Sequence, residues 1–96
     1  MGTYEHYEPV FSVLLSCVES IGGDGNGLLI VKQELFRKIA IWFNEYLRAV
    51  GRHYKVQTVE STYCLWSDGS NENIIIAGTD FDRTTFPYVD IVIETW

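Results

Sequence analysis

The residues with the clearest chemical potential are acidic. Asp80 and Asp82 flank Phe81 and are followed directly by Arg83. Two carboxylates beside a guanidinium are able to do acid–base work. The run Asp68-Gly69-Ser70-Asn71-Glu72 alternates oxygen ligands as calcium-binding loops do, but it lacks their twelve-residue frame and distal glutamate. We therefore interpret the first cluster as a solvated loop and the second as a hairpin turn.

Other chemically useful side chains give no stronger site. Those that commonly bind transition metals or act as nucleophiles are His6, His53, Cys17 and Cys64. Their spacing matches no zinc or iron site, and no serine-nucleophile motif is present. The run Gly23-x-Gly25-x-Gly27 follows a predicted helix and lacks the Lys-Ser/Thr pair of a phosphate loop, so we interpret it as a turn. We expect no catalytic residues, metal or cofactor, and two reduced cysteines in the core.

Charge is segregated along the chain. The net charge is −6, and residues 32–55 carry six of the seven basic side chains against two acids, whereas residues 56–96 carry seven acids against Arg83. A negative total argues against direct binding to a phosphate backbone, which depends on accumulated Lys and Arg. It favours docking to a protein with a basic surface.

Hydrophobic periodicity predicts a single α+β domain over residues 1–96. Apolar residues recur at helical spacing over 8–21 and 33–50. Residues 54–66, 72–79 and 88–96 are rich in strand-forming side chains, and the mixed alternation of 54–66 indicates a bulge or bend. The expected fold is two helices packed on one face of a three-stranded antiparallel sheet, in the order α-α-β-β-β. A short extra strand over 28–31 is left open.

An acidic sheet face is the first candidate interface. Carboxylates on the predicted strands and at their ends would form a band that also carries aromatic side chains: Glu60, Glu72, Asp80, Asp82, Asp90 and Glu94, with Tyr88 and Trp96. Aromatic anchors contribute much of the binding energy at protein interfaces. The alternative is ordinary solubilising charge.

The polar face of the second helix is the other candidate interface. Ile41 projects from it among charged residues, namely Arg37, Lys38, Glu45 and Arg48. An apolar anchor inside a charged rim is typical of interfaces. A lone exposed apolar residue is also common, and this alternative stays open.

These features favour binding over catalysis. A small, acidic, aromatic-rich chain of this type resembles phage-encoded inhibitors of host defence and toxin-neutralising immunity proteins. The leading hypothesis is a stoichiometric inhibitor of a nucleic-acid-handling defence enzyme, of the anti-CRISPR or anti-restriction type. The alternatives are an immunity protein that blocks a nuclease toxin, and a homodimeric structural or adaptor subunit. No apolar run approaches the ~20 residues of a membrane span, so we expect a cytoplasmic protein.

Overall fold

The computed structural model describes residues 4–22, 24–69 and 72–95. Gly23, Ser70, Asn71 and Trp96, which belong to two predicted turns and to the predicted acidic face, lie outside this part of the chain. Within it, the helices and strands follow in the order α1 (Glu8–Ile21), β1 (Asn26–Val31), α2 (Phe36–Ala49), β2 (Lys55–Val59), β3 (Tyr63–Ser67), β4 (Asn73–Gly78) and β5 (Ile91–Thr95). Short 3₁₀ turns are η1 (Tyr4–His6), η2 (Gln33–Leu35) and η3 (Arg83–Thr85).

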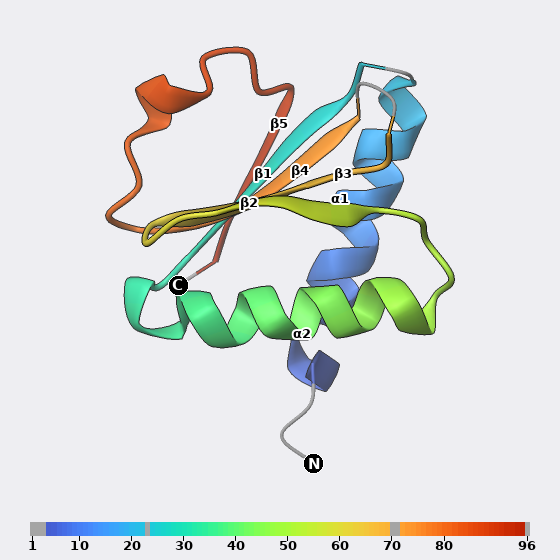
Figure 1. Cartoon of the computed structure of the whole chain (residues 1–96), viewed down its shortest axis with the longest axis horizontal. Coiled ribbons are helices and arrows are strands. Elements are labelled where there is room, and N and C mark those ends of the chain that lie inside the picture. The colour runs from blue at the N-terminus through green and yellow to red at the C-terminus, as the bar shows by residue number, and fades with distance from the viewer. Residues whose placement is uncertain (1–3, 23, 70–71, 96) are drawn as a thin grey trace.

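The strands form one five-stranded mixed sheet in the order β2-β3-β4-β1-β5 (Figure 1). The inner strand β1, which lies between β4 and β5, runs parallel to both of them, whereas β2, β3 and β4 form an antiparallel meander. The predicted three-stranded antiparallel sheet and the order α-α-β-β-β are therefore wrong. The strand left open over 28–31 is present, and it is an inner strand of the sheet, between β4 and β5.

The three-stranded prediction left β1 open for a physical reason, which is the burial of this strand on both faces. Every residue from Gly27 to Val31 is buried, because both faces of the strand are covered. Such a strand is a continuous apolar run, which periodicity does not distinguish from a piece of buried helix. The predicted strand over 54–66 is in fact two strands, β2 and β3, joined by a tight turn that is closed by a hydrogen bond from the Glu60 N–H to the Tyr63 carbonyl (2.8 Å).

Both helices cover the same face of the sheet (Figure 1). Phe11 of α1 and Phe43 of α2 meet edge-on at 5.1 Å between ring centroids, and Phe43 also meets Trp66 of β3 at 4.9 Å. Helix α1 approaches β1 so closely that a Cβ at Gly27 would lie 2.6 Å from Val18 Cγ2. This glycine thus serves close helix–strand packing.

The opposite face of the sheet is covered by the segment between β4 and β5. Phe81 and Phe86 of that segment pack on Tyr63 of β3, with ring centroids 5.5 and 5.2 Å away. Leu28 and Ile75 lie beneath them in a second buried cluster.

In the described part of the chain, neither helix is long and apolar enough to cross a bilayer. The helices and the segment between β4 and β5 cover the outer edge at β2 least. Four of the five residues of this strand are exposed.

Candidate functional site

Two apolar side chains of β2 point to the same face of the sheet because the strand contains a bulge. Val56 pairs with Trp66 and Val59 pairs with Cys64, while the register shifts between Val56 and Thr58. In a regular strand, side chains three positions apart point to opposite faces. The extra residue, Gln57, resets this alternation. Both valines therefore lie on the face that carries the helices.

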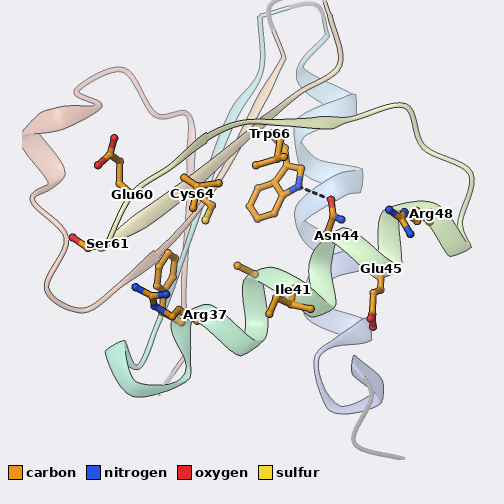
Figure 2. Close-up of a pocket in the computed structure, with 13 residues that line it drawn as sticks. Arg37, Ile41, Asn44, Glu45, Arg48, Glu60, Ser61, Cys64 and Trp66 are labelled. Carbon is orange, nitrogen blue, oxygen red and sulfur yellow. Dashed lines mark hydrogen bonds between the residues drawn. The ribbon is translucent and has the colours of Figure 1, made fainter.

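Helix α2 does not extend over β2, and a groove of about 670 Å³ lies between them (Figure 2). Its floor consists of buried side chains from α2 and β3, namely Phe36, Ala40, Cys64 and Trp66. Val56 and Val59 line its β2 side and are 46% and 69% exposed. Ile41, which is 61% exposed, lines its α2 side. Apolar side chains therefore form the floor of the groove and part of both walls.

The floor of the groove is held by packing and by one side-chain hydrogen bond. The Trp66 indole Nε1 donates to Asn44 Oδ1 at 3.3 Å, which ties β3 to α2 (Figure 2). Burial raises the pKa of the Cys64 thiol, and this effect outweighs the opposing influence of a backbone hydrogen bond at Glu60 and of the Arg37 charge. The thiol thus stays protonated at neutral pH and behaves as part of the apolar floor.

Charged side chains surround the groove. Four of the five residues predicted at the helix interface line it: Arg37, Ile41, Glu45 and Arg48. They are joined by Glu60 and Ser61 from the turn between β2 and β3 (Figure 2). The fifth, Lys38, does not line the groove, and its Nζ lies 5.9 Å from the centroid of the Trp42 ring. We call Arg37, Ile41, Glu45, Arg48, Val56, Val59 and Glu60 together the α2–β2 surface.

The predicted acidic face is spread across the molecule. Glu60 belongs to the groove beside β2, whereas Glu94 lies on β5, the strand at the opposite edge of the sheet. Asp80 and Tyr88 are exposed in the segment between β4 and β5. The described carboxylates thus come from several segments of the fold, and their role in partner binding stays a prediction.

Several of these carboxylates make hydrogen bonds within the fold. Glu72 accepts one from the Tyr54 hydroxyl (2.7 Å), and burial, followed by this bond, raises the pKa of Tyr54. Asp90 accepts one from the backbone N–H of Asn26 at 2.9 Å. Glu94 pairs with Arg83. The fold thus uses these acids to fasten its strands and loops.

Asp82 caps the short turn η3. Its side chain accepts hydrogen bonds from the Thr84 hydroxyl and from the Thr84 backbone N–H, and these bonds lower the pKa of the carboxyl. The sequence Asp80-Phe81-Asp82-Arg83 therefore builds a turn, with Phe81 buried against the sheet. Within residues 4–22, 24–69 and 72–95, no group of three or more His, Cys, Asp or Glu side chains is arranged to hold a metal ion.

Sequence reasoning missed the contribution of Val56 and Val59 to the site. Their spacing of three places them on opposite faces of any regular strand, so no pattern in the sequence joins them. The only signal was the mixed alternation of residues 54–66, which indicated a bulge or bend without its position. The structure confirms the bulge and shows that it creates one wall of the groove.

Comparison with known proteins found no matching family model, no similar curated protein and no similar solved structure. Conclusions about function therefore rest on the geometry and chemistry of the surface itself.

Proposed function

We propose that this chain is a protein-binding domain, without catalytic activity, that contacts its partner through the α2–β2 surface. The observation that carries the proposal is the convergence of Ile41, Val56 and Val59 on one groove with a buried apolar floor and a charged rim. An apolar centre surrounded by polar side chains is the usual anatomy of a protein interface.

Single exposed apolar residues are ordinary, so the grouping is what matters. Val56 and Val59 come from β2, Ile41 comes from α2, and a bulge was needed to bring the two valines to the same side. An exposed edge strand that served only solubility would carry charged side chains at such positions. The arrangement supports a surface that is covered when a partner binds.

Inhibition by occlusion is the mode of action that we propose for such binding. A net charge of −6 supports attraction to a basic partner, such as an enzyme that handles nucleic acid. The acids outside the groove, such as Asp80, would steer the approach, while the apolar groove would supply the contact area. Charge reversal of Asp80 should then slow association and leave dissociation nearly unchanged.

The test of the proposal compares the two edges of the sheet. Val59 on β2 and Val92 on β5 are both exposed valines on edge strands, and only Val59 lines the groove. The tagged chain would be used to capture partners from cells that carry its gene, in three forms: wild type, Val59→Lys and Val92→Lys.

We expect Val59→Lys to lose captured partners that Val92→Lys retains, because placing a charge against an apolar contact is costly at an interface. Circular dichroism would show that both variants are folded. Equal capture by the three forms would contradict the proposal.

A further inference from the structure

The charges on the outer side of α2 are arranged antisymmetrically about Ile41. Arg37 lies four residues before Ile41 and Glu45 lies four residues after it. Positions four apart share one side of a helix and are separated by about 6 Å along its axis. A positive and a negative charge thus lie about equally far to either side of one exposed apolar side chain.

The antisymmetry extends one turn further. Arg48 follows Ile41 by seven residues, and Glu34 precedes it by seven. Glu34 belongs to η2, the 3₁₀ turn that leads directly into α2. Read along the chain from Glu34 to Arg48, the series is therefore negative, positive, apolar, negative, positive. All five side chains are exposed.

Such a series is complementary to itself when one copy is turned around. If two α2 helices pack antiparallel about a two-fold axis at Ile41, each Arg37 faces the Glu45 of the other copy. The same axis brings Glu34 opposite Arg48. An interface with two-fold symmetry requires this property, that one patch complements itself. A parallel arrangement would place like charges opposite each other.

The fold does not use these charges internally. In the part of the chain that the structure describes, Arg37, Glu45 and Arg48 make no ion pair, whereas Arg52 pairs with Glu19 and Arg83 pairs with Glu94. Lys38, the neighbour of Arg37, lies instead over the Trp42 ring. Arg37, Glu45 and Arg48 are therefore available for contacts with another chain.

We propose that the occupant of the α2–β2 surface is a second copy of this chain, packed with its α2 antiparallel to the first and centred on Ile41. This inference rests on the proposed function, because both partners use the same surface: the weak dimer covers it in the free protein and gives way to the basic partner. Isoleucine side chains meet at the axis, the ion pairs between Arg37 and Glu45 flank them on both sides, and Val56 and Val59 border the contact. Because the central apolar area is small, the dimer has a dissociation constant between about 1 µM and 1 mM.

The first experiment measures mass by sedimentation equilibrium over a range of concentrations. Wild type is expected to dimerise reversibly, and dimerisation is expected to weaken several-fold between about 0.05 and 0.5 M salt, because salt screens exposed ion pairs. Ile41→Glu should be monomeric. Val13→Glu, at an exposed position of α1 that is similarly apolar, is the matched control and should still dimerise. A wild-type chain that stays monomeric at about 1 mM overturns the proposal.

The second experiment uses charge swaps, which leave the apolar residues untouched. Arg37→Glu alone places two carboxylates opposite each other, and Glu45→Arg alone places two guanidinium groups opposite each other, so each variant should be monomeric. Mixed in equal amounts, the two variants should form a heterodimer, since every facing pair is then of opposite charge. Lys38→Glu makes the same change of charge next to Arg37 and should dimerise alone. A mixture that stays monomeric, or single variants that dimerise as wild type does, overturns the antiparallel contact.

These outcomes separate the two proposals. If the wild-type chain is monomeric while Val59→Lys still loses a captured partner, the dimer is wrong and binding of a different protein through the groove survives. If the dimer forms and Val59→Lys changes no capture, the surface is a self-association surface and the inhibitor role must use another one. Far-UV circular dichroism of each variant ensures that loss of association is not loss of folding.

Discussion

The two edges of the sheet handle the same physical problem in different ways. An edge strand presents unpaired backbone groups and must be protected from unwanted strand pairing. At β5 the fold uses polar ties: Glu94 pairs with Arg83, and the hydroxyl of Thr95 donates to the Ile30 carbonyl at 3.5 Å. At β2 a bulge interrupts the regular ladder and directs Val56 and Val59 into a groove.

The bulge in β2 has two consequences. The bulge makes the edge a poor template for another strand, and it also gathers apolar side chains where a partner's side chains are able to reach them. Association at this edge should therefore depend on side-chain packing more than on backbone pairing. The polar edge at β5 should contribute little to either stability or association.

The largest expected difference between the two edges is in the free energy of unfolding that is lost when a side chain beneath each edge is truncated. Trp66 next to β2 is 2% exposed and contacts Phe43 and Asn44, whereas Ile93 on β5 is only half-buried. Trp66→Ala should lower the free energy of unfolding by about 3–5 kcal/mol, and Ile93→Ala by clearly less. Urea denaturation followed by circular dichroism measures both. Equal losses would show that the groove floor carries no special share of the stability.

A smaller effect on stability is expected from the ionisation of the Cys64 thiol, which lies in the floor of the groove. Burial raises the pKa of this thiol in the folded protein. Well below about pH 8.5, the ordinary pKa of a cysteine thiol, the thiol is protonated in both states and its contribution to stability is fully present. As the pH rises through about 8.5 and beyond, the unfolded chain loses the proton first, so the free energy of unfolding falls, by at most about 1.4 kcal/mol per pH unit.

The variant Cys64→Ala should show a flatter decline of stability over this alkaline range. Cys17→Ala is the matched control, since Cys17 lies on α1, away from the groove. Urea denaturation at several pH values provides the slopes. A Cys64→Ala slope identical to that of wild type would contradict the assigned burial of the thiol.

The smallest effect is expected at the polar edge. Arg83 and Glu94 form an ion pair of half-exposed side chains, so solvent screens their attraction. A double-mutant cycle with Arg83→Ala and Glu94→Ala should give a coupling of about 0.2–1 kcal/mol that disappears at high salt. A larger coupling that persists in salt would mean that the β5 edge is as strongly built as the β2 edge.

Local sequence patterns predicted much of the structure. The spacing of apolar residues located both helices, and the side of α2 that carries Ile41 was predicted correctly because helical geometry alone determines it. Helical geometry also grouped the charged residues around Ile41; all of them except Lys38 line the groove, and their contact with a partner stays a prediction. Four of the five residues proposed on this helix consequently belong to the candidate site.

Only the tertiary structure decided the strand pairing. The run Leu28–Val31 carries no sign that it lies between β4 and β5, because a strand buried on both faces has no alternation to read. The place of the bulge at Gln57 was also hidden, since the register of β2 is set by its pairing with β3. The sequence by itself thus determined one wall of the groove, on α2, through the fixed period of the helix. Long-range pairing determined the other wall, on β2, and brought the two together.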